Sequence, residues 1–238
     1  LLESLRIDSD VKEPSEQRQT ARKKMGVTEK GPVIGLLPGS RDREVATLLS
    51  PMLDTVRILK SSRPEIQFLL PIAETLPWDP IASRAIEAGV TPVRGAQNVL
   101  KATDMAIIAS GTATLEAALV GTPSVLTYRF HPLTFTIAQW MSNLPHDRYY
   151  LGLVNILAAE EIFPEVLQQE VNGSNLSMEM RRLMDNEQRC AYVKRRLEDV
   201  RHSLEKDSAE QTHESLSSES KANCFDRAAR EILGLAFE

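Results

Sequence analysis

The sequence predicts an α/β fold with a doubly wound, Rossmann-like parallel sheet, and three observations support this prediction. Between residues 31 and 128, short apolar segments alternate with segments whose apolar residues recur every three or four positions. Each short segment is apolar along nearly its whole length, which is typical of a strand that helices cover on both faces. The chain has 238 residues and is 42% hydrophobic, so it can bury one substantial core. Strands that alternate with helices in this way form a parallel sheet with right-handed crossovers.

Five strands are expected, each a short apolar run next to Gly, Pro or polar residues. The helix after the first strand is well defined, because its apolar residues recur from Val45 to Leu59 at three- and four-residue steps. The expected strands are residues 32–37, 67–71, 91–93, 105–109 and 124–128, and the helices between them are 45–59, 80–88, 96–102 and 112–120.

The segments on either side of the expected sheet are mostly helical. Residues 1–30 are polar and charged, and we expect them to connect a preceding domain to a domain over 31–204, with a helix at 14–24. The start at Leu1 indicates a piece of a longer protein. Later helices are expected at 133–142, 164–170, 177–204 and 224–235, with a flexible Ser- and Glu-rich insertion at 205–221 and a C-terminal helical segment over 222–238.

The composition excludes several classes of function. The formal net charge of -5 gives no electrostatic reason to bind nucleic acid, and no basic patch is interleaved with aromatic residues. No apolar run reaches the ~20 residues that span a bilayer, and no signal peptide is present. Cys190 and Cys224 lie far apart without metal-ligand spacing, so we expect free thiols, a cytoplasmic protein and no metal or cofactor.

The first candidate site is the loop at residues 38–41, which follows the first strand. Gly39 allows a tight turn and a close approach of a ligand to the backbone. Ser40 is placed to cap the next helix, and Arg41 adds a fork of donors where the helix dipole already favours an anion. Glu44 follows in the first helical turn. The alternative is an ordinary strand-to-helix turn with a solvated Arg41.

The second candidate site follows the fourth strand. Ser110, Gly111 and Thr112 form a turn of small residues before a helix, so free backbone N–H groups face the strand end and suit a diphosphate. Glu116 lies about one turn into that helix, where its carboxylate could accept hydrogen bonds from both hydroxyls of a ribose. The alternative is a well-capped packing helix with Glu116 at the surface.

Arg129 is a third candidate, because it follows the fifth strand and could neutralise phosphate charge; otherwise it is a surface Arg. The chain has no nucleophile elbow, no Walker lysine loop and no G-x-G-x-x-G segment. No catalytic base is evident in these residues. We therefore expect the chemistry to be completed elsewhere.

Two segments resemble the signatures of the lipid-A-disaccharide synthase family. One is LLPGSR at residues 36–41 with Glu44, and the other is ASGTATLEAAL at 109–119. The similarity continues in the same order through Pro123, residues 128–129 and 132–134, NILA at 155–158 and FPEVLQ at 163–168.

The resemblance implies one half of a two-domain, GT-B-type glycosyltransferase with an inverting, metal-independent reaction. Family members transfer a diacylated glucosamine from UDP to the lipid acceptor lipid X and form the β-1,6-linked disaccharide of lipid A. The resemblance also implies a cytoplasmic enzyme that is peripheral to the inner membrane, and we expect a possible homodimer. The implied UDP-binding residues are Gly39, Ser40, Arg41, Glu44, Ser110, Gly111, Thr112, Glu116, Arg129 and Asn155.

Within this set, Arg41 is expected to stabilise the leaving group, and Asn155 to lie on a loop that faces the interdomain cleft. Residues 31–204 would be the nucleotide-sugar-binding domain, and the base would come from the N-terminal domain. Two other functions stay open from the sequence. One is a UDP-sugar transferase or epimerase of the same architecture acting on a different sugar, and the other is a degenerate domain that binds a nucleotide or partner without catalysis.

Overall fold

The computed structural model describes residues 14–28, 31–129 and 150–214, and it confirms the predicted fold class. Six parallel strands form one sheet in the order β3-β2-β1-β4-β5-β6. The chain thus builds one side of the sheet outward from β1 and then returns to build the other side from β4, as in a doubly wound fold. The strands are β1 Val33–Leu37, β2 Gln67–Pro71, β3 Thr91–Val93, β4 Met105–Ala109, β5 Ser124–Tyr128 and β6 Glu165–Leu167.

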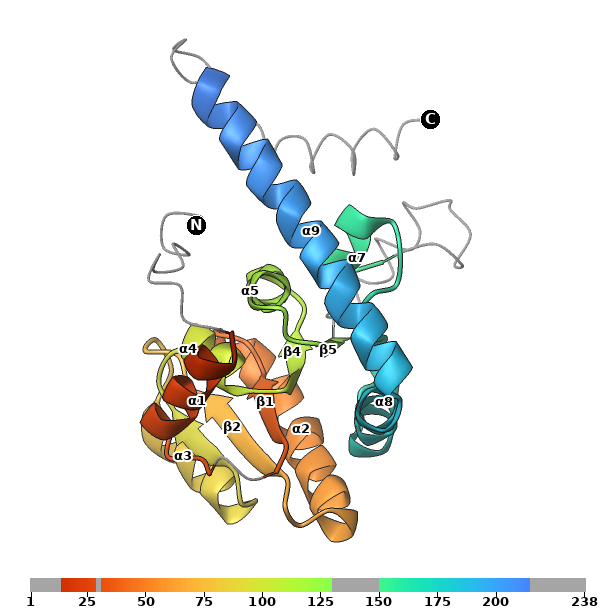
Figure 1. Cartoon of the computed structure of the whole chain (residues 1–238). Coiled ribbons are helices and arrows are strands. Elements are labelled where there is room, and N and C mark those ends of the chain that lie inside the picture. Colours follow the sequence, from red (N-terminus) through yellow and green to blue (C-terminus); the bar gives the residue numbers. More distant parts are fainter. Residues whose placement is uncertain (1–13, 29–30, 130–149, 215–238) are drawn as a thin grey trace.

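Helices cover both faces of the sheet (Figure 1). On one face α2 packs against α8, and on the other α4 contacts both α1 and α5. β1 is buried along its whole length and β4 along all but its first residue, as the apolar runs predicted. The helices are α1 Pro14–Lys24, α2 Asp42–Ser62, α3 Trp78–Glu87, α4 Ala96–Ala102, α5 Thr112–Val120, α7 Leu153–Ala158, α8 Gly173–Asp185 and α9 Glu187–Glu214.

The predicted helix over residues 164–170 is wrong. Residues 165–167 form the edge strand β6, in which Val166 lies opposite Thr127 of β5, and the 3-10 turn Gln168–Glu170 follows. Pairing with β5 satisfies this backbone, and a strand of three residues is too short to show a period. Helix α7 was not predicted either.

The single helix predicted over 177–204 is two helices. The chain leaves helical geometry at Asn186, whose side-chain oxygen accepts a hydrogen bond from the amide of Arg189 at 2.9 Å, so Asn186 caps the first turn of α9. α9 then continues to Glu214, into the stretch that was predicted to be a flexible insertion. Residues 215–221, the predicted helices at 133–142 and 224–235, and residues 1–13 of the predicted connector lie outside the described residues.

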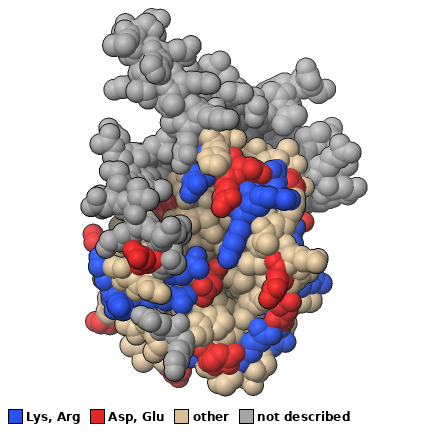
Figure 2. Space-filling model, viewed as in Figure 1, with Lys and Arg blue, Asp and Glu red and all other residues tan. Residues whose placement is uncertain are grey.

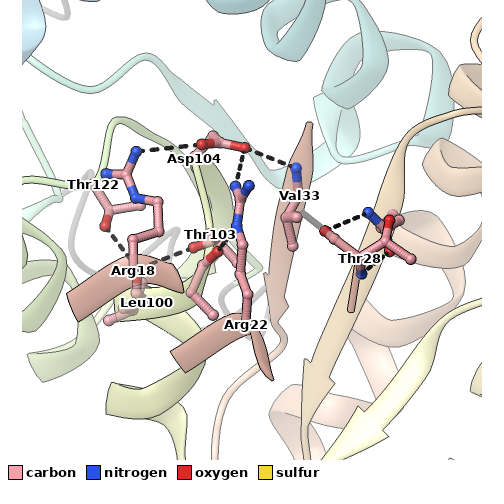
Figure 3. Close-up of polar contacts among 10 residues, drawn as sticks. Arg18, Arg22, Thr28, Val33, Leu100, Thr103, Asp104 and Thr122 are labelled. Atoms are coloured by element: carbon pink, nitrogen blue, oxygen red, sulfur yellow. Dashed lines mark hydrogen bonds and ion pairs between the residues drawn. The ribbon is translucent and has the colours of Figure 1, made fainter. Parts of the chain in front are cut away.

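The predicted connector helix α1 packs onto the domain through an ion-pair cluster (Figure 3). The guanidinium of Arg22 contacts a carboxylate oxygen of Asp104 at 2.6 Å and donates to the carbonyl of Ala102 at 3.0 Å. The same carboxylate accepts a hydrogen bond from the amide of Val33 at 2.9 Å, and its other oxygen lies 3.3 Å from the guanidinium of Arg18. Residues 14–28 therefore belong structurally to the sheet and its helices. None of the helices in the described ranges is long and apolar enough to cross a membrane.

Candidate functional site

The two loops predicted to bind a ligand lie at the switch point of the sheet. β1 and β4 are neighbours, with Leu37 opposite Ile108 near their carboxyl ends. The chain order reverses between these two strands, and ligands of doubly wound sheets bind in the crevice at such a point. Residues 38–41 follow β1 and residues 110–112 follow β4. The fold therefore brings the two candidate loops together.

In the first loop, a side chain of the protein itself holds the backbone amides. One oxygen of the Glu44 carboxylate accepts the amides of Ser40 at 3.1 Å and Arg41 at 3.4 Å. The other oxygen accepts the Arg41 guanidinium at 2.9 Å. The expected cap at Ser40 is wrong: α2 begins at Asp42, its N-cap residue is Arg41, and the side chain that satisfies the loop amides is Glu44. Ser40 instead accepts at its carbonyl from the Thr75 hydroxyl, 3.1 Å away.

Gly39 is needed for this arrangement. Its φ is +109°, a region that other residues rarely adopt. A Cβ at this position would lie 2.1 Å from a carboxylate oxygen of Glu44 and 2.8 Å from the Glu44 Cβ. The close approach that the sequence indicated at Gly39 is therefore an approach to Glu44.

In the second loop, the amide of Ser110 donates to the carbonyl of Thr127 at 3.0 Å, but the amides that follow are unoccupied. α5 begins at Thr112 after Gly111, and in the described part of the chain the amides of Gly111, Thr112 and Ala113 have no hydrogen-bond partner. A Cβ on Gly111 would meet nothing within 4 Å, so the backbone here borders open space. Ser110 donates its hydroxyl to the carbonyl of Leu151 at 3.1 Å, which ties this loop to the segment before α7.

Glu116 lies on α5 close to these amides in sequence. Burial raises the pKa of its carboxyl group, because desolvation penalises the charged form. No hydrogen bond or ion pair joins this carboxylate to another described residue. A half-buried carboxylate without a partner, on a helix that begins at the switch point, is available to accept hydrogen bonds from a ligand.

Arg129 and Asn155 differ from Gly111, Thr112 and Glu116, because their side chains already have hydrogen-bond partners within the fold. Arg129 follows β5, and its guanidinium donates to the carbonyls of Gln168, at 3.2 Å, and Val171. It fastens the turn after β6, and its predicted contact with phosphate stays a prediction.

The expectation for Asn155 needs correction. The residue lies on α7 rather than on a loop and is fully buried. Its amide group donates to the carbonyl of Phe163 at 2.7 Å and to Glu165 at 2.9 Å, and its oxygen accepts the amides of Ile162 and Phe163 at 3.0 and 2.9 Å. Because all of these polar positions are used within the fold, Asn155 holds the backbone after α7 and does not face a cleft.

Glu165 is a structurally important residue that sequence reasoning missed. Its carboxylate accepts the amides of Leu151 and Gly152, each at 2.9 Å, just before α7 begins. Two helix N-termini, those of α2 and α7, thus already hold a carboxylate of the chain. The contact spans 14 positions in sequence, so no local pattern indicates it. Before α5, in contrast, the amide of the N-cap residue Gly111 has no partner among the described residues.

Charged residues of both signs are mixed on one face of the molecule, where Figure 2 shows acidic and basic side chains interspersed. Within the described ranges, no group of three or more His, Cys, Asp or Glu side chains is arranged to hold a metal ion.

Comparison with known proteins gives a consistent result. The chain matches the model of the family described as lipid-A-disaccharide synthetase over residues 8–220. It is 36% identical over 199 residues to a lipid-A-disaccharide synthase of Trichlorobacter lovleyi, covering 82% of this chain and 51% of that protein. It is 38% identical over 174 residues to one of Myxococcus xanthus, covering 71% and 44%. The chain thus spans about half the length of the curated relatives it matches.

Two solved structures show the same fold. WaaG, a glycosyltransferase involved in lipopolysaccharide biosynthesis, aligns with a TM-score of 0.55 at 14% identity, over 92% of this chain and 51% of WaaG. The C-terminal domain of a group 1 glycosyl transferase of Francisella tularensis aligns with a TM-score of 0.51 at 12% identity, over 78% of this chain and 91% of that domain. These likenesses confirm the predicted fold class, an α/β fold with a doubly wound, Rossmann-like parallel sheet. Because the family model covers most of its length, the chain belongs to the lipid-A-disaccharide synthetase family.

Proposed function

We propose that this chain is the donor-binding half of a lipid-A-disaccharide synthase. The complete enzyme would transfer 2,3-diacylglucosamine from UDP to lipid X and form the β-1,6-linked disaccharide of lipid A. The family match supports this reaction, and the chain's length relative to its relatives supports the role of one half. The observation that carries the proposal is the unpartnered N-cap amide of α5 at the switch point, together with the unpartnered carboxylate of Glu116 on the same helix.

The diphosphate of UDP would bind at the first amides of α5. A helix N-terminus favours an anion through its unpaired N–H groups and its dipole. The amide of the N-cap residue Gly111 has no described partner and borders open space, whereas Glu44 and Glu165 accept the N-cap amides of Arg41 in α2 and Gly152 in α7. This contrast selects α5 among the three helices.

Glu116 would bind the ribose of the nucleotide. A carboxylate with free lone pairs can accept hydrogen bonds from two neighbouring hydroxyls. Burial has already removed part of its hydration, which is reflected in its raised pKa, so a pair of hydroxyl donors would replace water that the fold excludes.

Arg41 would stabilise the leaving group as negative charge develops on the β-phosphate of UDP. Its side chain is 83% exposed at the switch point. The base that deprotonates the acceptor hydroxyl would come from the other half of the complete enzyme. In a complete enzyme, we expect Arg41→Ala to lower kcat more than it lowers UDP affinity, as measured by steady-state kinetics and equilibrium binding. Unchanged turnover would contradict this role.

The partners follow from the proposed reaction. They are a UDP-activated acylated glucosamine and a lipid acceptor, and the enzyme would act in the cytoplasm, peripheral to the inner membrane and with a possible homodimeric assembly.

Calorimetric titration of this chain with UDP tests the proposal. We expect UDP to bind, ADP to bind more weakly, and Glu116→Ala to weaken UDP binding. Glu87→Ala serves as the matched control, because Glu87 is an exposed carboxylate at the end of another helix, α3. Equal binding of UDP and ADP, or equal loss in both variants, would contradict the nucleotide site as described. Absence of UDP binding would favour a degenerate, non-catalytic domain.

A further inference from the structure

We propose that Glu44 is a positioning residue: its carboxylate acts as an internal anion that orders the loop between β1 and α2 and orients Arg41 toward the phosphates. This inference rests on the proposed function, which supplies the phosphates. It differs from a role for Glu44 in direct contact with UDP. It also assigns the two loops at the switch point different tasks, since one would bind the diphosphate through its backbone and the other only through a side chain.

The hydrogen bonds of the Glu44 carboxylate all go to the loop that precedes its helix, α2. One carboxylate oxygen accepts the amides of Ser40 and Arg41, at 3.1 and 3.4 Å, and the other accepts the guanidinium of Arg41, at 2.9 Å. The Glu44 side chain is only 18% exposed, whereas that of Arg41 is 83% exposed. The carboxylate is therefore directed inward to the loop, and the guanidinium extends into solvent.

The loop is built around this carboxylate. Gly39 adopts φ +109°, and a Cβ there would lie 2.1 Å from a Glu44 oxygen, so a side chain at position 39 and the observed position of Glu44 exclude each other. From the other side, the Thr75 hydroxyl donates to the carbonyl of Ser40 at 3.1 Å. The loop is thus held by Glu44 from within and by Thr75 from the segment after β2.

A phosphate at the α2 N-terminus would have to displace Glu44. The amides of Ser40 and Arg41 that a phosphate would use already donate to the Glu44 carboxylate, and a second anion beside it would be repelled. The guanidinium, in contrast, uses one of its donors on Glu44 and keeps the others for a ligand. This loop can therefore contribute a guanidinium to a diphosphate that the amides of α5 hold.

Orientation by Glu44 has a measurable benefit. An exposed arginine samples many rotamers, and fixing such a side chain on binding opposes affinity. A contact that is already present in the free protein lowers this cost, which corresponds to about a three- to tenfold gain in affinity for the ligand that Arg41 touches. A ligand without phosphates gains nothing from it.

The test compares UDP with uridine in four proteins: the unaltered chain, Glu44→Gln, Arg41→Ala and the double variant. Glutamine keeps the size of the side chain and one acceptor oxygen for the loop amides, but it loses the ion pair. We expect Glu44→Gln to weaken UDP binding about three- to tenfold, to leave uridine binding unchanged, and to have no further effect once Arg41 is Ala. Asp42→Asn is the matched control, since it removes an exposed charge of the same helical turn.

Other outcomes overturn the inference. Glu44→Gln binding UDP more tightly would make Glu44 a competitor of the phosphate. An equal loss with and without Arg41 would mean that Glu44 acts on the ligand directly, and a loss shared by uridine would mean general damage to the site.

A second measurement tests the loop without any nucleotide. We expect Gly39→Ala to lower the melting temperature less in a Glu44→Ala background than in the unaltered chain, because the steric conflict is then removed. Equal shifts would contradict the arrangement of the loop. A chain that binds no UDP would contradict the proposed function and remove the positioning role with it, while the melting-temperature comparison would still report on the loop.

Discussion

Replacement of Asp104 by Ala removes the acceptor at the centre of the cluster that fastens α1 to the sheet. The carboxylate contacts Arg22 at 2.6 Å and Arg18 at 3.3 Å, and it accepts the amide of Val33, the first residue of β1, at 2.9 Å. Figure 3 shows these groups converging on Asp104 from α1 and from β1. The substitution therefore acts at once on a helix contact and on the start of a central strand.

The three contacts differ in value because they differ in burial. Leaving the buried Val33 amide without an acceptor costs about 1–3 kcal/mol. Arg22, whose side chain is 10% exposed, loses a charge-assisted hydrogen bond worth roughly 1.5–3 kcal/mol but keeps its bond to Ala102. The side chain of Arg18 is 33% exposed, so the loss of its ion pair costs only about 0–1 kcal/mol more. Asp104 is itself 32% exposed, so water can replace part of what is lost. We expect a destabilisation of about 2–4 kcal/mol, or roughly 5–15 °C in Tm.

Urea denaturation followed by far-UV circular dichroism measures this difference. Asp185→Ala is the matched control: Asp185 pairs with Arg63 at 2.5 Å, but the two side chains are 47% and 37% exposed, so the expected cost is about 0–1 kcal/mol. Hydrogen exchange should also show loss of protection in α1 for Asp104→Ala only. Equal stability of the two variants, or unchanged exchange in α1, would refute the reasoning from burial.

Two further predictions concern Asn155 and Glu116. Asn155→Ala leaves the amides of Ile162 and Phe163 without acceptors in a fully buried region, so we expect the free energy of unfolding, measured by thermal unfolding, to fall by about 2–4 kcal/mol. A fall of less than about 0.5 kcal/mol would contradict this structural role and favour a contact of Asn155 with the ligand. For Glu116, burial raises the pKa in the free protein, so its ionisation opposes folding: the stability linked to this group is full below its unfolded pKa and is lost as pH rises through the folded pKa. Glu116→Gln should therefore stabilise the unliganded chain at neutral pH, as measured by urea titration. Ribose hydroxyls favour the charged form of Glu116, so UDP affinity should fall as pH drops through the raised pKa, and Glu116→Gln should lose this part of the pH dependence. Calorimetry of both proteins at each pH removes the contribution of phosphate ionisation, because that contribution is the same in both. Identical pH profiles would exclude the ribose contact.

Much of the fold could be predicted because its signals are local. The apolar runs that became β1, β2, β4 and β5 each bury almost completely, and the segments between them carry a helical period. The loops after β1 and β4 were found for the same reason, since strand, small residues and helix follow one another along the chain. Their position side by side follows from the topology that alternating strands and helices impose.

Short or capped elements could not be predicted in this way. β6 has three residues and owes its conformation to pairing with β5, about 40 positions earlier in the chain. The division between α8 and α9 depends on a cap at Asn186 within a stretch whose helical pattern is otherwise continuous. α1 carries few apolar residues, and its attachment depends on Asp104, more than 80 positions away.

The sequence by itself determined the fold class, the family and the two loops at the switch point, because strand and helix periods and the signature residues are read within a few positions of one another. Only the tertiary structure decided at which of these helix N-termini a carboxylate of the chain itself is bound. Glu44 and Glu165 accept the N-cap amides of α2 and α7, while the N-cap amide of α5, that of Gly111, has no described partner. The tertiary structure also shows that Asn155 is buried in the interior, whereas the sequence had led us to expect it at the interdomain cleft. The physical reason is the same in each case: whether a polar group is available to a ligand depends on which partners the folded chain has already brought to it.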